Sequence, residues 1–127
     1  MKRIIIGITG ATGTIYGSRL MEMLREEGDT EIHLVMSPSA KLTLKMEYDV
    51  EPDYINSLAH EVHAPNNIGA SISSGSFASA GMIVAPCSIK TMSNIAMGNT
   101  GDLISRAADV ILKERRRLVI AIRETPL

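Results

Sequence analysis

Polar side chains cluster where one apolar run of the sequence ends. Residues 82–85 are typical of a buried strand that breaks at Pro86, and a stretch with helical character begins directly afterwards. Ligands of parallel sheets bind just beyond the carboxyl ends of the strands, and free N–H groups at a helix start attract phosphate. Two hydroxyls and an ammonium group suit the same ligand. This junction therefore predicts phosphate binding by Ser88, Lys90 and Thr91.

Two other predicted strands end in a similar way. Residues 10–13 read Gly-Ala-Thr-Gly and lie between a predicted strand, residues 3–9, and a predicted helix, residues 16–27. Glycine lets the backbone approach a phosphate closely, but the G-x-G-x-x-G pattern is incomplete, so a purely structural turn is the alternative. Ser37 follows the predicted strand 32–36, where it either caps the next helix or contacts the phosphate.

Charged residues near the C-terminus are candidates for binding an anion or moving a proton. Arg106 and Lys113 lie about two turns apart on a predicted helix and so share a face. An exposed surface on which Asp109 pairs with Lys113 is the alternative. Arg123 and Glu124 follow the last predicted strand, where one group could grip a phosphate and the other handle protons.

Other reactive side chains give weaker signals. Glu47, directly after the second predicted helix, is a further candidate acid. Cys87 is interpreted as a small buried hydrophobe, because no histidine lies near it in the sequence to activate a thiol. His33, His60 and His63 lack the spacing of a metal site, so they are interpreted as incidental and no metal site is predicted.

The composition is that of a globular protein. The chain has 127 residues, 45% of them hydrophobic and 21% charged, and its length predicts a single domain, residues 1–127. A net charge of −1 does not indicate binding to nucleic acid or to an anionic membrane. No apolar run reaches the roughly 20 residues of a membrane span. A single cysteine fits a reducing cytoplasm, the expected location.

Predicted strands and helices alternate along the chain, which indicates an α/β fold with a parallel sheet. Near-continuous hydrophobicity in the first strand favours a sheet covered on both faces. Residues 63–69 are predicted to form a loop. Strands are expected at 3–9, 32–36, 82–85 and 118–122, and helices at 16–27, 37–46, 52–61, 88–98 and 103–116, the last of these being the longest.

Five ordered motifs together resemble the UbiX/Pad family of flavin prenyltransferases. The resemblance spans nearly the whole chain and implies a Rossmann-like or flavodoxin-like three-layer fold, an FMN site at a subunit interface, and trimer-based homo-oligomers such as dodecamers. Family members continue beyond the last motif with a strand, a helix, a tyrosine and a basic residue, so the chain is expected to be C-terminally short. The motifs lie at residues 10–17, 73–77, 86–91, 106–115 and 123–127.

The resemblance also implies the reaction. A dimethylallyl group would move from dimethylallyl phosphate or diphosphate to N5 and C6 of reduced FMN, without a metal. The product, prenylated FMN, would serve a UbiD-type decarboxylase. Two alternatives stay open. The chain could be a non-catalytic FMN-binding accessory subunit of a decarboxylase, or a relative of the FMN-dependent cysteine decarboxylases. The second alternative would need a catalytic histidine near the first helix, and none is found there.

The resemblance assigns roles to individual residues. Gly10, Ala11 and Thr12 would line the flavin, with the Thr12 hydroxyl near N5, where many members have serine. Glu47 would lie near the flavin and handle protons, and Glu124 would relay a proton to the leaving phosphate. The anion contacts would be made by Ser37, Ser88, Ile89, Lys90, Thr91 and Arg123 toward FMN, and by Arg106, Lys113 and Arg123 toward the prenyl phosphate.

Overall fold

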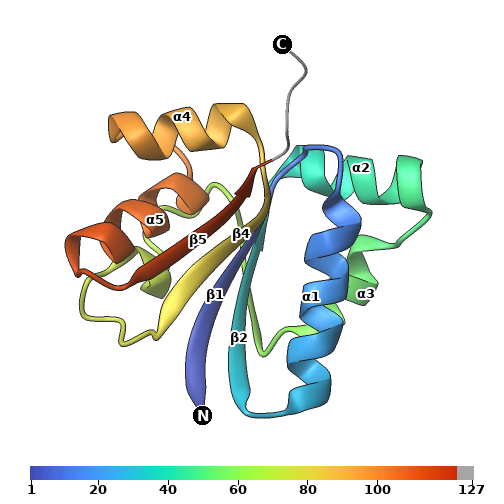
Figure 1. The fold of residues 1–127 in the computed structure, drawn as a ribbon, viewed down its shortest axis with the longest axis horizontal. Helices are drawn as coiled ribbons and strands as arrows, with labels where there is room; N and C mark the ends of the chain where they lie inside the picture. Colours follow the sequence, from blue (N-terminus) through green and yellow to red (C-terminus); the bar gives the residue numbers. More distant parts are fainter. Residues whose placement is uncertain (123–127) are drawn as a thin grey trace.

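A parallel five-stranded sheet forms the middle of the molecule (Figure 1). The structure is a computed structural model and describes residues 1–122. In space the strands follow the order β3-β2-β1-β4-β5, so the direction of winding reverses between β1 and β4. The strands are β1 (Lys2–Ile8), β2 (Thr30–Met36), β3 (Glu61–His63), β4 (Gly81–Cys87) and β5 (Arg117–Ile122).

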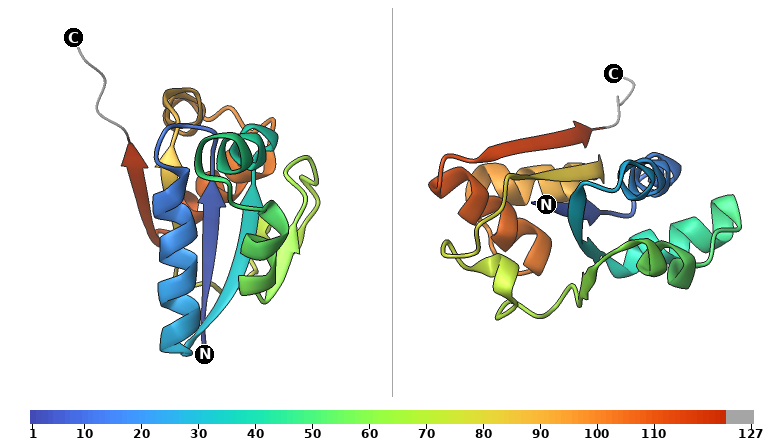
Figure 2. Two further views of the ribbon diagram at one scale, coloured as in Figure 1. Left: turned by 90° about the vertical axis from the view of Figure 1, so that its right-hand side faces the viewer. Right: turned by 90° about the horizontal axis from the view of Figure 1, so that it is seen from below.

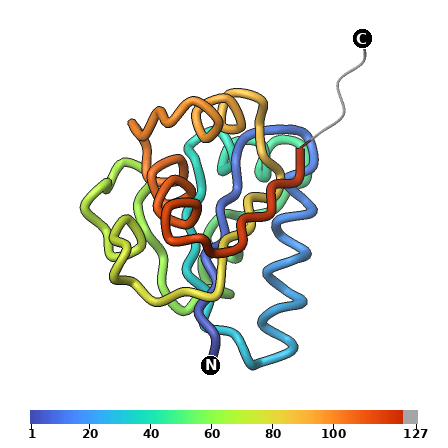
Figure 3. Tube along the Cα trace, turned by 60° about the vertical axis from the view of Figure 1, so that its left-hand side comes forward, coloured from blue at the N-terminus to red at the C-terminus, as the bar shows by residue number. Residues whose placement is uncertain are grey.

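Helices cover both faces of this sheet (Figure 2). The helices are α1 (Thr14–Glu27), α2 (Pro38–Tyr48), α3 (Pro52–Leu58), the short 3-10 helix η1 (Ser71–Ser73), α4 (Ile89–Met97) and α5 (Leu103–Lys113). The first three pack on one face, whereas α4, α5 and η1 lie on the other, as the chain trace also shows (Figure 3). The three-layer Rossmann-like fold expected from the sequence is thereby confirmed.

Alternation along the strands divides the core in two. Ile6 and Ile8 of β1 pack toward α1, α2 and α3, while the preceding residue Ile5 points to the opposite face and packs toward α5. Both sides are apolar because a parallel sheet is buried on both faces. Within residues 1–122, no helix is both long enough and apolar enough to cross a membrane.

The sheet has one strand that the sequence did not predict. The helix expected at 52–61 ends at Leu58, and Glu61–His63 then pairs with His33–Val35 of β2 as the edge strand β3. Three residues reading Glu-Val-His carry no strand pattern of their own. The pairing therefore depends on tertiary contact with β2, which local propensity does not encode.

Other boundaries also differ from the expectation. Strand β4 does not break at Pro86 but continues to Cys87, with an irregular register against β5 beyond Val84. Helix α5 ends at Lys113, shortly before Arg115 adopts a positive φ of 55°. It has 11 residues, so the expectation that it is the longest helix was wrong, since α1 has 14. Leu112, near the end of α5, is 49% exposed.

Helix α1 packs against β4 so closely that one position requires glycine. A Cβ at Gly17 would overlap the carbonyl oxygen of Ala85 and lie 3.0 Å from the side chain of Ile8. We expect Gly17→Ala to lower the free energy of unfolding by about 1–3 kcal/mol, because overpacking outweighs the better helix propensity of alanine. Urea denaturation measures this change.

Gly101→Ala is the matched control, because a Cβ there meets no atom within 4 Å. We expect this variant to unfold at nearly the wild-type urea concentration. Equal stability of the two variants would contradict the close packing of α1 on β4.

Candidate functional site

Three helices begin at the same end of the sheet, each with a polar side chain at its N-terminus. Ser37 of α2, Ser88 of α4 and Asp102 of α5 each accept a hydrogen bond from the backbone N–H three residues later, at 3.1, 3.1 and 2.9 Å. Capping was one of the two roles expected for Ser37, and the structure confirms it. Three helix N-termini pointing at one region create a positive potential there.

An open pocket of about 480 Å³ lies between these helix starts. It sits at the carboxyl ends of β1, β2 and β4, which includes the point where the winding of the sheet reverses. Ligands of doubly wound sheets bind at this position. The pocket is lined by Thr9, Gly10, Ser37, Pro38, Ser39, Pro65, Asn66, Ser88, Lys90, Thr91, Asn94, Gly101, Asp102 and Ile104.

Thr9 holds two of the lining loops together. Its hydroxyl donates to the carbonyl oxygen of Pro86 at 2.7 Å and accepts from the N–H of Ser88 at 2.8 Å, and the residue is 2% exposed. The N–H of Ser37 donates to the carbonyl oxygen of Ile8 at 2.9 Å, which ties the third loop to the first. The start of α4 and the start of α2 are therefore fixed relative to the end of β1.

The glycine-rich loop passes very close to α2. A Cβ at Gly10 would overlap the side chain of Ser39 and lie 2.9 Å from its carbonyl carbon, so only glycine fits. Gly13 has a φ of 104° and donates its N–H to the hydroxyl of Tyr48 at 3.2 Å. The loop thus lies directly against the pocket and is anchored at both ends of α2.

The charged groups of the pocket favour an anion. Among the described residues that line it, Lys90 is the one cation and Asp102 the one carboxylate. The two oxygens of Asp102 accept from the N–H and the hydroxyl of Ser105, both at 2.9 Å, so they serve the helix cap. Lys90 and the helix N-termini are left to attract a phosphate.

The structure brings five of the sequence-predicted residues together in this pocket. These are Gly10, Ser37, Ser88, Lys90 and Thr91. Their shared position follows from the parallel sheet, because the carboxyl ends of neighbouring strands meet at one edge.

Thr12 lines a separate, smaller hollow of about 220 Å³. Tyr16, Pro86, Ala121 and Ile122 form the rest of this hollow, which is mainly apolar. Ala11 lies between the two cavities in sequence and lines neither, and Ile89 is 46% exposed on α4.

The remaining candidates lie away from the main pocket. Glu47 is exposed within α2, and Arg106 is half-buried on α5. Lys113 pairs with Asp109 at 3.2 Å with 72% of its side chain exposed, which is the alternative that the sequence left open. Since α5 starts at the pocket, Lys113 lies about 15 Å further along the helix axis. Two further candidates, Arg123 and Glu124, are outside the described residues.

Several lining residues were not predicted. Four residues that line the pocket were not assigned to it from the sequence: Thr9, Ser39, Asn66 and Asp102. An Asp followed three residues later by a serine at the start of an apolar helix is a readable capping signal, so Asp102 could have been found. Asn66 could not, because its loop reaches the pocket only through the unpredicted strand β3.

Cys87 is buried at the end of β4, which agrees with its structural interpretation. Burial raises the pKa of its thiol to about 11, so the thiolate is scarce at neutral pH. Among the histidines, His33 and His63 meet each other and Glu61 in three dimensions, a grouping that their sequence spacing did not predict.

Comparison with known proteins finds close relatives. The Flavoprotein family model matches residues 1–127. The flavin prenyltransferase UbiX of Escherichia coli K12 is 54% identical over all of this chain and 67% of its own length. A crystal structure of AnUbiX (PadA1) in complex with FMN and dimethylallyl pyrophosphate superposes with a TM-score of 0.96 at 52% identity, over 99% of this chain and 66% of that one.

A second solved structure agrees with these findings. It is a dodecameric FMN-dependent UbiX-like decarboxylase from E. coli O157:H7, with a TM-score of 0.96 and 48% identity over 98% of this chain and 68% of that one. The present chain spans about two thirds of the length of the relatives it matches.

The position of Cys87 leads to a test of its reactivity. At pH 8 a thiol with a pKa of about 11 is roughly one part in a thousand ionised, so we expect a maleimide or disulfide reagent to react very slowly with the folded protein. The same protein in guanidinium should react at the rate of a free cysteine. Raising the pH toward 11 should accelerate the reaction while the fold persists. Rapid labelling at pH 8 would contradict the burial of this thiol.

Proposed function

The chain belongs to the flavoprotein family and, within it, to the UbiX flavin prenyltransferases, and we propose that it transfers a dimethylallyl group from dimethylallyl phosphate or diphosphate to reduced FMN. The observation that carries this proposal is the convergence of three helix N-termini and Lys90 on one pocket at the winding reversal of the sheet. FMN ends in a phosphate, which is the ligand that such a place favours.

The lining residues fit the phosphate end of FMN. Ser88 and Thr91 offer two hydroxyls 3.0 Å apart at the start of α4, and Ser37 and Ser39 offer two more, 3.2 Å apart, at the start of α2. Lys90 supplies the balancing charge. We assign Gly10 to the backbone surface beside the flavin, because its lack of a side chain keeps that part of the pocket open.

The smaller hollow suits the reacting end. Reduced FMN supplies the electron-rich ring that accepts the allyl group at N5 and C6, while the donor releases its phosphate. The apolar hollow beside Thr12 would hold a five-carbon chain and exclude water from the allylic carbon. The Thr12 hydroxyl, exposed at its rim, is assigned to hydrogen bonding near N5, and Ala11 to the wall between the cavities.

The remaining assignments are proposals as well. Arg106, Lys113 and Arg123 would stabilise the departing phosphate, Glu47 would handle protons during ring closure, and Glu124 would protonate the leaving group. Lys113 is too far along α5 to serve the pocket of its own chain, so its role requires a site shared between subunits. Within residues 1–122 the buried Nε of the half-buried Arg106 has no hydrogen-bond partner, which fits a group awaiting a ligand or a neighbouring subunit.

Exposed apolar side chains support assembly into a homo-oligomer. Ile89 and Met97 of α4, Leu112 of α5, and Val119 and Ile122 of β5 are 46–77% exposed. A solved UbiX-like relative is dodecameric. We therefore assign to this chain a single catalytic domain in a trimer-based assembly in the cytoplasm, whose product would serve a UbiD-type decarboxylase.

One reaction tests the proposal against the accessory-subunit alternative. The purified protein is incubated anaerobically with reduced FMN and either dimethylallyl phosphate or the diphosphate, and the flavin is then analysed by mass spectrometry. We expect the flavin mass to increase by one prenyl unit, and comparison of the two donors identifies the preferred phosphate. Tight FMN binding without a mass change would instead identify a carrier, and absence of FMN binding would contradict both.

The phosphate assignment has its own test. Replacing Ser88 and Thr91 together by alanine should weaken FMN binding by about tenfold or more, because hydrogen bonds to a phosphate are charge-assisted. Fluorescence titration of FMN measures the affinity. The lost α4 cap should also destabilise the apoprotein by about 1 kcal/mol, so unfolding is measured alongside.

Two further variants isolate the binding effect. Lys90→Ala, an exposed change, should weaken FMN binding without loss of stability. Ser57→Ala on α3 is the matched control, because this exposed serine lies outside the pocket, and its affinity should equal that of the wild type. Wild-type affinity in both pocket variants would overturn the assignment of the phosphate to α4.

A further inference from the structure

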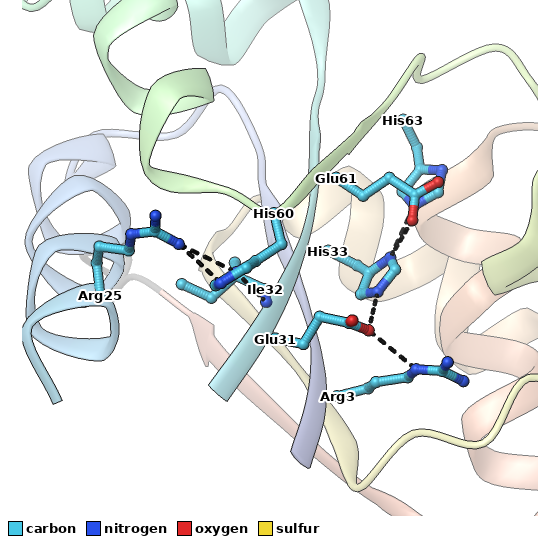
Figure 4. Close-up of polar contacts among 8 residues, drawn as sticks. All are labelled: Arg3, Arg25, Glu31, Ile32, His33, His60, Glu61 and His63. Carbon is cyan, nitrogen blue, oxygen red and sulfur yellow. Dashed lines mark hydrogen bonds and ion pairs between the residues drawn. The ribbon is translucent and has the colours of Figure 1, made fainter. Parts of the chain in front are cut away.

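Two buried histidines and a glutamate meet at the β3 edge of the sheet (Figure 4). His33 of β2 is 2% exposed and His63 of β3 is 8% exposed. The Nδ1 of His33 lies 3.1 Å from the Nε2 of His63 and 3.5 Å from a carboxylate oxygen of Glu61. The register places Glu61 opposite His33 on the paired strand, and His63 follows two residues later on the same face.

The opposite side of the His33 ring fixes its tautomer. Its Nε2 lies 2.9 Å from a carboxylate oxygen of Glu31, and the same oxygen accepts from the Nε of Arg3 at 2.9 Å. A ring that donates from Nε2 presents the lone pair of Nδ1 to His63 and Glu61. Imidazoles that ligate metals almost always donate their other N–H to a carboxylate, a backbone carbonyl or a water, and here the acceptor is the carboxylate of Glu31.

The two separations that His33 makes with His63 and Glu61 match those of a tetrahedral metal centre. Ligand atoms about 2.0–2.2 Å from Zn²⁺ lie roughly 3.3–3.5 Å from one another, and the two measured separations of 3.1 and 3.5 Å bracket that range. All three ligand atoms lie within 4.8 Å of one another. The carboxylate of Glu61 is 60% exposed, so it can adjust its position while the two rings are held by the core.

The ring positions are rigid for reasons unrelated to a ligand. The rings of His33 and His63 stack with centroids 5.4 Å apart, and the ring of Phe77 meets His33 edge-on at 4.9 Å. The guanidinium carbon of Arg3 lies 5.1 Å from the centroid of the Phe77 ring, over its face, which helps to hold this ring in place. Two imidazoles are thus preorganised, which lowers the entropy cost of binding an ion.

We propose that His33, His63 and Glu61 form a binding site for a divalent transition-metal ion of the Zn²⁺ type, with a fourth position open to solvent. Two nitrogens and one oxygen favour such an ion over Mg²⁺ or Ca²⁺, which prefer oxygen ligands. The carboxylates of Glu31 and Glu61, with only Arg3 opposing them in the cluster, leave a negative charge that attracts the cation.

This site is separate from the flavin pocket. His33 precedes Ser37 by four residues on an extended strand, a distance of about 13 Å. The bound ion would join the short edge strand β3 to β2, and its expected effect is on the stability of that edge, not on the prenyl transfer. The inference therefore stands whether or not the proposed function holds.

Titration of the untagged, chelator-treated full chain with Zn²⁺ in a calorimeter tests this proposal. We expect one ion per chain with a dissociation constant in the micromolar range or below, no comparable binding of Mg²⁺, and a higher melting temperature with Zn²⁺ present. Co²⁺ in place of Zn²⁺ should give the visible absorption of a tetrahedral complex. Absence of saturable Zn²⁺ binding would overturn the proposal and leave a proton shared between the two rings.

Variants locate the ion. Glu61→Gln changes an exposed side chain, so it should fold normally and weaken Zn²⁺ binding at least about tenfold. His63→Ala should abolish binding. His60→Ala is the matched control, because this exposed histidine contacts Arg25 and the N–H of Ile32 outside the cluster (Figure 4). Binding that survives Glu61→Gln and His63→Ala, or that is lost in His60→Ala, would refute the site.

Discussion

The hydroxyl of Thr9 is the contact on which the main site depends. It joins the end of β1 to the start of α4 by accepting from the N–H of Ser88 while donating to the carbonyl of Pro86. Without this bridge, two neighbouring strands would deliver their loops to the same edge of the sheet but not in a fixed relation. A phosphate site built from N–H groups needs that relation, because its donors cannot rotate as side chains do.

Much of the fold could be predicted from the sequence because it rests on local patterns. The apolar run of β1, the Ser37-Pro38 start of α2 and the Ser88 cap of α4 each carry a signal within a few residues. Strand β3 carries none and exists because His33–Val35 offers an edge to pair with. The same limit applied to the sites: residues after predicted strands were found, while Asn66 and the pairing of His33 with Glu61 required the three-dimensional arrangement.

Polar groups lie at two places on this sheet for different physical reasons. At the carboxyl ends of the strands, the backbone supplies positive ends of helix dipoles and the side chains are mostly hydroxyls. At the β3 edge, the cluster is made of side chains alone, held by stacking and by the pleat of β2 and β3. The first arrangement suits an anion and the second a cation. The domain thus places a site for an anion and a site for a cation about 13 Å apart along β2.

The close approach of Gly10 to Ser39 bears on how such a pocket can diversify. Because a Cβ at position 10 would overlap Ser39, this side of the pocket cannot be reshaped by substituting Gly10 without displacing the start of α2. Residues 65, 66 and 94 also line the pocket, and because they are half-buried or exposed, substitutions there would disturb the core less. Proteins with this fold could therefore accept differently shaped ligands through substitutions at these three positions, while the helix starts that bind the phosphate stay the same.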